Sequence, residues 1–162
     1  MNAASIVPIA SRGYGRLAHI ADHLRSPLLL AVRLYWGWQF FITGQGKLTN
    51  LPKVAGFFKD LGIPLPMFNA VLAATTECVG GLLLMVGLCS RITSIPLIIT
   101  MVVAYLTADS EAVKAIWSDS NGFVTAAPFL FLFISLLVLV FGPGAFSIDH
   151  LLARKFGKGK LP

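Results

Sequence analysis

Two ionisable residues interrupt apolar stretches of this sequence of 162 residues. Arg33 lies in the stretch PLLLAVRLYWGWQFFITGQG, and Glu77 lies in MFNAVLAATTECVGGLLLMVGLC. A charged side chain at the centre of a bilayer costs about 2.5–3.5 kcal/mol on insertion scales, and such residues often pair with one another or serve function. At 1.5 Å per residue the two lie about 9 Å and about 18 Å from the same membrane face. We expect the long arginine side chain to bridge that difference and form an Arg33–Glu77 pair between two helices.

The pair has two interpretations that the sequence leaves open. It is either a structural lock between helices or a polar site for a ligand headgroup or a proton. Small and aromatic residues share its faces at helical spacing, which allows two backbones to approach closely. The expected lining of such a pocket is Trp36, Gly37, Phe40, Gly44, Lys47, Gly80 and Gly81.

No catalytic motif accompanies these residues, so the catalytic residues are unknown and an enzymatic activity is undecided. His19 and His23 have the i, i+4 spacing of a metal pair, but no carboxylate or cysteine completes a set, and we predict no metal site. Cys78 and Cys89 are too far apart on one helix for a disulfide. The sequence therefore shows no cofactor bound covalently or by motif.

Composition identifies the environment that must hold these residues. The chain is 56% hydrophobic and only 12% charged, whereas soluble domains have about 25% charged residues. The mean hydropathy is +0.79. These values exclude an ordinary soluble enzyme and a disordered chain, and they indicate an integral membrane protein.

Four apolar segments are long enough to cross a bilayer, which takes about 20 residues. Continuous apolarity favours helices over barrel strands, which alternate. The sequence thus predicts an all-α, four-helix membrane bundle over residues 27–142, with spans at residues 27–46, 67–89, 92–108 and 123–142.

Basic residues predict the orientation of the bundle. They concentrate in both terminal segments, and Arg91 adds one more in the link between the second and third spans. This pattern predicts that both termini lie in the cytoplasm and that the protein is held in the plasma (bacterial inner) membrane. The net charge of +6 is therefore a sign of topology and not of nucleic-acid binding.

Short amphipathic helices are expected beside the spans, lying in the membrane interface. One falls in the cytoplasmic tail of residues 1–26 and one in the first loop, where Val54, Phe57, Phe58 and Leu61 recur at helical spacing. After the fourth span, Ser147 is placed to cap another short helix. The basic segment 143–162 then lies against anionic headgroups through Arg154, Lys155, Lys158 and Lys160.

The order of residues resembles the DoxX family of small four-helix membrane proteins. The similarity covers roughly residues 28–153 and rests on four groups of residues: Arg33 with the glycines up to Gly44 and Lys47; Gly62-Ile63-Pro64; Glu77-Cys78-Val79-Gly80-Gly81 with Gly87-Leu88-x-x-Arg91; and Gly142-Pro143-Gly144-x-x-Ser147-x-Asp149. The family is named for a subunit associated with a terminal quinol oxidase and with thiosulfate:quinone oxidoreductase, and other members are linked to oxidative-stress complexes.

The resemblance implies an accessory or quinone-associated subunit of a membrane redox complex. Its partners would be the lipid bilayer, a membrane or peripheral redox protein and, in some arrangements, further copies of the chain. Two alternatives stay open on the residues alone: a non-catalytic scaffold or assembly protein, and a small proton-linked carrier that acts as an oligomer and titrates Glu77.

Overall fold

A computed structural model describes residues 3–156, and within them the side chains of residue 15 and residues 19–156. This part of the chain forms eight helices and no strand, so the expected all-α class is confirmed. The side chains of Arg12, Arg16 and Leu17, and all of Lys158 and Lys160, lie outside the described residues.

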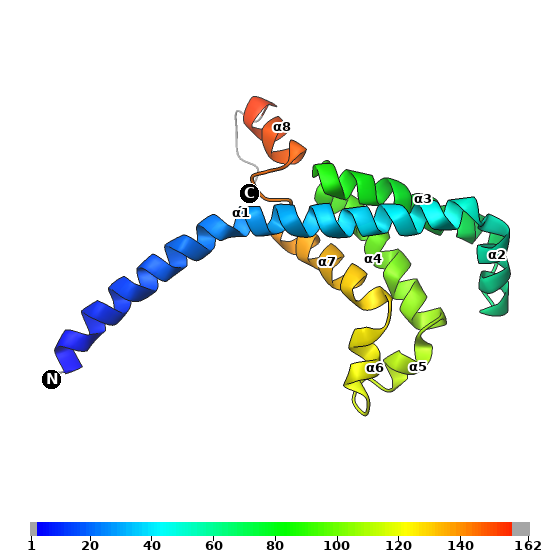
Figure 1. Ribbon diagram of the computed structural model, residues 1–162, viewed down its shortest axis with the longest axis horizontal. Helices are drawn as coiled ribbons and strands as arrows, with labels where there is room; N and C mark the ends of the chain where they lie inside the picture. The colour runs from blue at the N-terminus through cyan, green and yellow to red at the C-terminus, as the bar shows by residue number, and fades with distance from the viewer. Residues whose placement is uncertain (1–2, 157–162) are drawn as a thin grey trace.

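The first helix, α1 (Ala3–Thr49), is one continuous run of 47 residues, about 70 Å long at 1.5 Å per residue. Figure 1 shows its N-terminal half extending away from the other helices. We expected a separate tail helix and a span that begins at Pro27, but α1 continues through this boundary. Two residues before Pro27, Arg25 donates a hydrogen bond to the Phe141 carbonyl at 3.0 Å. This bond joins α1 to the end of the helix that finishes at Phe141.

The next three helices follow through short turns. They are α2 (Leu51–Asp60), α3 (Pro66–Val86) and α4 (Ser90–Thr107). Gly87, with φ of 70°, ends α3, and the Leu88 N–H bonds the Leu83 carbonyl at 3.0 Å. This glycine cap reverses the chain within three residues, so the expected hairpin between the second and third segments is present.

The fourth apolar segment differs from our expectation of one helix over residues 123–142. It is divided into α6 (Ser120–Thr125) and α7 (Pro128–Phe141), and α6 follows the short helix α5 (Ser110–Lys114). Pro128 has no N–H to continue the helical ladder. Beside this break, the Phe123 carbonyl accepts a hydrogen bond from the Tyr105 hydroxyl at 2.8 Å. The last helix is α8 (Ile148–Phe156), and the Ser147 hydroxyl accepts from the His150 N–H at 3.1 Å, which is the cap expected there.

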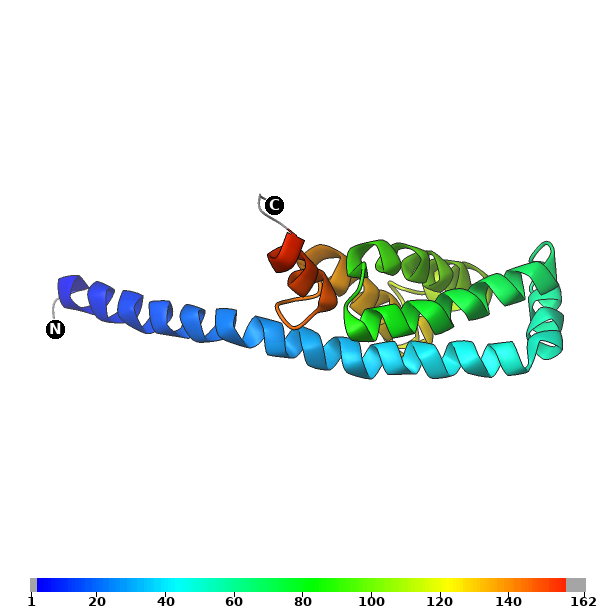
Figure 2. The ribbon, with the colours of Figure 1, turned by 90° about the horizontal axis from the view of Figure 1, so that it is seen from above.

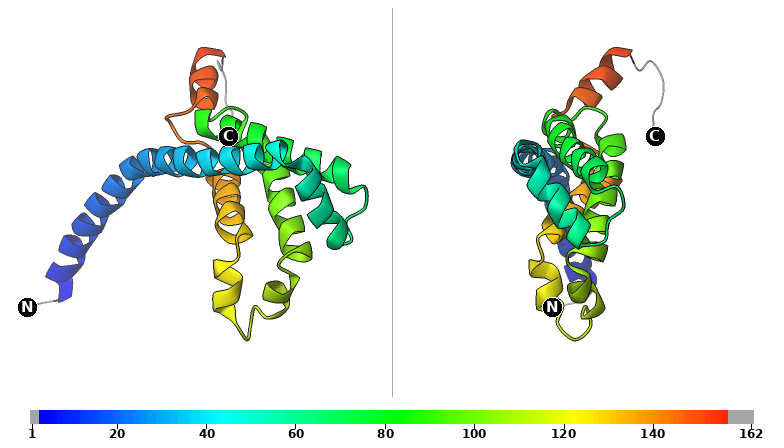
Figure 3. Two further views of the ribbon diagram at one scale, coloured as in Figure 1. Left: turned by 45° about the vertical axis from the view of Figure 1, so that its right-hand side comes forward. Right: turned by 90° about the vertical axis from the view of Figure 1, so that its right-hand side faces the viewer.

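The long helices pack as two pairs. Helix α1 lies along α3, and α4 lies along α7. In Figures 1 and 3 the α4–α7 pair leaves the α1–α3 pair obliquely, while Figure 2 shows α1 and α3 running side by side. Where the pairs meet, the buried core consists of Phe40, Leu84, Leu97, Met101 and Val138. The oblique departure leaves room between α4 and the far end of α3.

Glycines form the contact between α1 and α3. A methyl group added at Gly81 would lie 2.6 Å from the Gly37 carbonyl oxygen, and one added at Gly44 would lie 2.8 Å from the Ala74 carbonyl oxygen. Only residues without a side chain allow two helix backbones this close. The contact therefore fixes the register of α1 against α3.

Two of the described helices, α3 and α4, have the length and composition of a membrane span. Helix α7 is apolar but has 14 residues, about 21 Å at 1.5 Å per residue. In α3 and α4 only 33% of the most apolar window is buried within the chain. Apolar surface left exposed on this scale is suited to lipid or to a membrane partner.

We predict that Gly44→Ala destabilises the protein by about 1–3 kcal/mol, because the added methyl group overpacks a contact between backbones. Gly46→Ala is the matched control, since it lies in the same helix with nothing within 4 Å of the added methyl group. Thermal unfolding in detergent measures both variants. Equal melting temperatures for the two would contradict the close contact.

Candidate functional site

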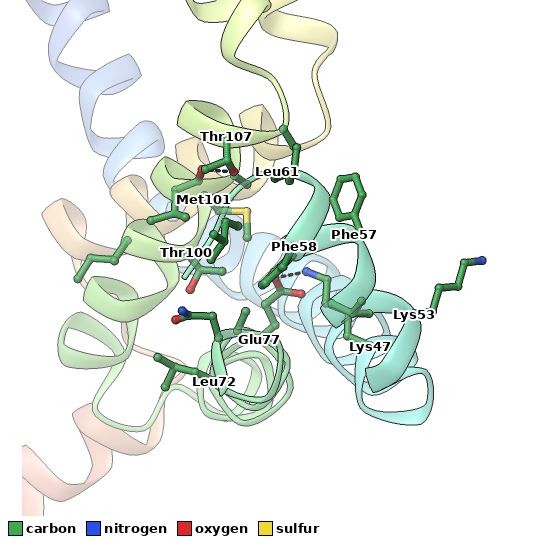
Figure 4. Close-up of a pocket in the computed structure, with 18 residues that line it drawn as sticks. Lys47, Lys53, Phe57, Phe58, Leu61, Leu72, Glu77, Thr100, Met101 and Thr107 are labelled. Atoms are coloured by element: carbon green, nitrogen blue, oxygen red, sulfur yellow. Dashed lines mark hydrogen bonds and ion pairs between the residues drawn. The ribbon is translucent and has the colours of Figure 1, made fainter. Parts of the chain in front are cut away.

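An apolar cavity of the described chain lies where α4 diverges from α3 and where α2 folds across the gap. Its volume is about 490 Å³. Figure 4 shows its lining side chains converging from the end of α1 and from α2, α3 and α4. Most of them are apolar, including Phe57, Phe58, Leu61, Leu72 and Met101. The cavity can thus hold an apolar group of the size of a small ring system with part of a tail.

Helix α2 closes one side of this pocket. The residues expected to make it amphipathic, Val54, Phe57, Phe58 and Leu61, all line the cavity. The chain returns from α2 through Gly62, whose φ is 74°, and the Asn69 amide donates to the Pro64 carbonyl at 2.6 Å. The apolar side of the first loop therefore builds a pocket wall, a role that the sequence pattern did not distinguish from interfacial binding.

An ion pair sits in the wall of the pocket. Lys47, near the end of α1, donates to Glu77 Oε1 on α3, and the side chains are 33% and 1% exposed, respectively. Both residues line the cavity, and Figure 4 shows the ends of their side chains next to one another, joined by a dashed line. A buried carboxylate needs such a partner because an isolated charge in apolar surroundings is costly.

Glu77 is not fully satisfied by this partner. Its second oxygen, Oε2, is buried and has no hydrogen-bond partner among the described residues. An unpaired buried acceptor costs about 1–3 kcal/mol. The pocket is thus lined by two lysines, Lys47 and Lys53, and by a carboxylate with one oxygen that lacks a donor.

Arg33 belongs to a different part of the molecule. It is fully buried, its Nη2 donates to the Phe146 carbonyl at 2.5 Å, and its Nη1 lies against Gly87. Asp149 is the carboxylate whose negative charge interacts with the Arg33 guanidinium. The expected Arg33–Glu77 pair is therefore wrong: in the described part of the chain the ion pair of Glu77 is with Lys47.

The register of the helices explains this correction. Because Arg33 lies against Gly87 and Gly37 against Gly81, the α3 residue beside Arg33 is ten positions beyond Glu77. Ten residues of helix span about 15 Å, which is more than an arginine side chain can bridge. Lys47, on the same face of α1 as Arg33 but fourteen positions later, reaches Glu77 instead.

The C-terminal motif surrounds Arg33 and holds the turn between α3 and α4. Both Asp149 oxygens accept backbone hydrogen bonds, from the Cys89 N–H at 2.7 Å and from the Ser90 N–H at 2.9 Å. The Asp149 N–H donates to the Gly87 carbonyl at 2.9 Å. A carboxylate at the first N–H groups of α4 is a favourable cap. The motif therefore has a structural role.

The glycines of this motif shape its turn. Gly142 and Gly144, on either side of Pro143, have φ of 73° and 77°, a conformation that side chains disfavour. Gly144 packs against Leu29 of α1. The turn places Ser147 at the start of α8 and brings Asp149, within α8, to the start of α4.

Most residues expected to line a pocket pack between helices instead. Gly37, Phe40, Gly44, Gly80 and Gly81 are buried at helix contacts, and the Trp36 ring meets the Phe131 ring edge-on at 5.2 Å. Lys47 is the member of that set that lines the cavity. Sequence reasoning did not find its pairing with Glu77. The available signal was its place on the Arg33–Gly44 face of α1.

Comparison of the sequence with known proteins identifies the family of this chain. The family model described as DoxX matches residues 28–110, a range that contains every residue that lines the pocket. No solved structure matches the chain.

Three proteins are similar to the chain in sequence. It is 29% identical to "Uncharacterized membrane protein Rv3486" of Mycobacterium tuberculosis over 93% of this chain and 95% of that protein. It is 28% identical to "Inner membrane protein YqjF" of Escherichia coli over 79% and 94%, respectively. It is 32% identical to "Putative oxidoreductase CatD" of Bacillus subtilis over 51% of this chain and 60% of that protein.

Double-mutant cycles test the two charge assignments. We expect Lys47→Met and Glu77→Gln to couple by about 1 kcal/mol or more, because contacting residues are not additive. We expect Arg33→Gln and Glu77→Gln to add within about 0.5 kcal/mol, as residues that share no partner do. Unfolding in mixed micelles gives both energies. A larger coupling for Arg33 than for Lys47 would restore the pair expected from sequence.

Proposed function

The chain belongs to the DoxX family of membrane proteins, and on that premise we propose that it binds a lipid-soluble quinone as an accessory subunit of a membrane redox complex. The observation that carries the proposal is the apolar pocket with the Lys47–Glu77 pair in its wall. Ligand sites of this kind combine apolar walls with a few polar groups that orient the ligand.

The pocket has the chemical features that a quinone needs. Its volume of about 490 Å³ and its phenylalanine, leucine and isoleucine side chains suit a ring and the first part of an apolar tail. Lys47 is a hydrogen-bond donor that a ring oxygen can reach, since a third of its side chain is exposed. The exposed apolar surface of α3 and α4 would let the remaining tail lie in lipid.

A partner protein is part of the proposal. A bound quinone changes redox state only by exchanging electrons with a redox centre, so the partner must carry that centre. The relative named "Putative oxidoreductase CatD" is similar to this chain over 83 residues, which supports an association with redox chemistry.

The membrane arrangement that we propose has four spans, with α6 and α7 together forming the fourth, and both termini in the cytoplasm of a bacterial inner membrane. Arg91 and Arg154 favour this orientation, because basic residues concentrate on the cytoplasmic side. In this arrangement the α3–α4 turn and α8 lie at the cytoplasmic face, and the pocket lies toward the opposite face.

A scaffold role is the second candidate, and the surroundings of Arg33 favour it. Arg33 and Asp149 join α1, the α3–α4 turn and α8 through backbone groups of the chain. A protein whose helices are joined by these contacts and which exposes a large apolar surface can hold partners together without binding a small molecule. Ligand binding at the pocket distinguishes the two candidates.

We predict that Val103→Trp weakens binding of decylubiquinone at least about tenfold, because the larger side chain fills the pocket. Val102→Trp is a matched control. The two valines are adjacent in α4 and are 44% and 38% exposed, and only Val103 lines the pocket. Titration of the purified full chain in lipid nanodiscs, followed by native mass spectrometry, measures the affinity.

The comparison has three informative results. Weaker binding in Val103→Trp alone supports the pocket as the site. Equal losses in both variants indicate that quinone partitions onto the outer surface. No binding by the unmodified chain contradicts quinone binding and leaves the scaffold role.

A further inference from the structure

We propose that the pocket selects the reduced, hydroxyl-bearing hydroquinone over the quinone, with Glu77 Oε2 accepting a hydrogen bond from the ligand hydroxyl. This inference rests on the proposed quinone binding and specifies the redox form that the same site takes. It starts from Glu77, which lines the pocket and whose Oε2 is buried with no group of the described chain to satisfy it.

Glu77 presents an acceptor without a donor. Oε1 accepts from Lys47, whereas Oε2 is buried with no hydrogen-bond partner among the described residues. An ionised carboxylate can only accept hydrogen bonds. A ligand that satisfies Oε2 must therefore bring a hydrogen on oxygen or nitrogen.

Three of the other polar side chains around the cavity already donate elsewhere, and the fourth, Lys53, is exposed and makes no hydrogen bond to Oε2. The Thr100 hydroxyl donates to the Pro96 carbonyl at 2.9 Å, and the Thr107 hydroxyl donates to the Val103 carbonyl at 2.7 Å. The Asn69 amide donates to the Pro64 carbonyl at 2.6 Å. None of these donors is directed at Oε2, so the missing donor is left for a ligand to supply.

Lys47 sets the second condition on the ligand. An ammonium group has three N–H donors and no acceptor, and one of the donors of Lys47 is used by Glu77 Oε1. A hydroxyl oxygen can accept from Lys47 while its own hydrogen is donated to Glu77 Oε2. One phenolic hydroxyl thus satisfies both residues.

A quinone carbonyl meets only half of these conditions. Its oxygen can accept from Lys47, but it brings no hydrogen for Oε2 and places its lone pairs next to the carboxylate. Hydrogen bonds to an ionised acceptor are about twice as strong as neutral ones. The difference between the two redox forms at this oxygen therefore favours the hydroquinone, while the apolar contacts are the same for both.

The test compares decylubiquinol with decylubiquinone on the purified full chain in lipid nanodiscs without oxygen. We expect the unmodified protein to bind the quinol at least about tenfold more tightly, which corresponds to about 1.4 kcal/mol. Glu77→Gln should reduce this ratio to near 1, because the amide supplies a donor to the quinone carbonyl and no longer carries a charge. Lys59→Met, which changes an exposed lysine of α2 outside the pocket, should keep the ratio.

Each outcome separates the inference from the function on which it rests. If neither form binds, the proposed quinone binding fails. If both forms bind equally, or the quinone binds more tightly, quinone binding stands and the selection of the quinol is overturned. A quinol preference that persists in Glu77→Gln would also overturn it, since the acceptor would then be another group. The ratio in the unmodified protein decides the question even if Glu77→Gln does not fold.

Discussion

The close contact between α1 and α3 determines where the buried charges of the described chain, Arg33 and Glu77, lie. Gly37 and Gly81 bring the two backbones within reach of one another, and Gly44 repeats the contact further along α1. Two helices that touch through backbone atoms cannot slide by a residue without a clash. This fixed register puts Arg33 against the end of α3 and Lys47 beside Glu77. Arg33 and Glu77 therefore have different partners.

The same physical problem, a charge removed from water, has a different solution at each site. At Arg33, part of the guanidinium is bonded to the carbonyl of Phe146, and Asp149 in turn caps the start of α4. These contacts join the helices through groups of the chain itself, while Arg33 Nε and Nη1 have no hydrogen-bond partner in the described chain. At Glu77, one oxygen is paired with Lys47 and the other has no partner in the described chain. The two sites differ in their surroundings. Arg33 is enclosed by the chain beside Phe146 and Gly87, whereas Glu77 lines the apolar cavity, so we interpret the first as structure and the second as a place for a ligand.

The pocket itself arises from helix directions and not from any one residue. The α4–α7 pair departs obliquely from the α1–α3 pair (Figures 1 and 3), and α2 folds over the space that this leaves. The helical spacing of apolar residues in α2 predicts an amphipathic helix, and the helix is present. Periodicity cannot say whether such a face meets lipid headgroups or other helices, because both environments exclude water from apolar side chains.

The sequence by itself determined the helical class, the membrane environment, the glycine-lined face of α1 and the importance of Arg33 and Glu77, because apolar length, charge scarcity and helical spacing are local properties. It also placed the cap at Ser147 and the short turn after α3. Only the tertiary structure decided which charges meet. The pairing of Glu77 depends on the offset between two antiparallel helices, and an offset of ten residues shifts a side chain by about 15 Å. That offset is fixed by backbone contacts at glycines, which a single sequence reveals as small residues but does not align.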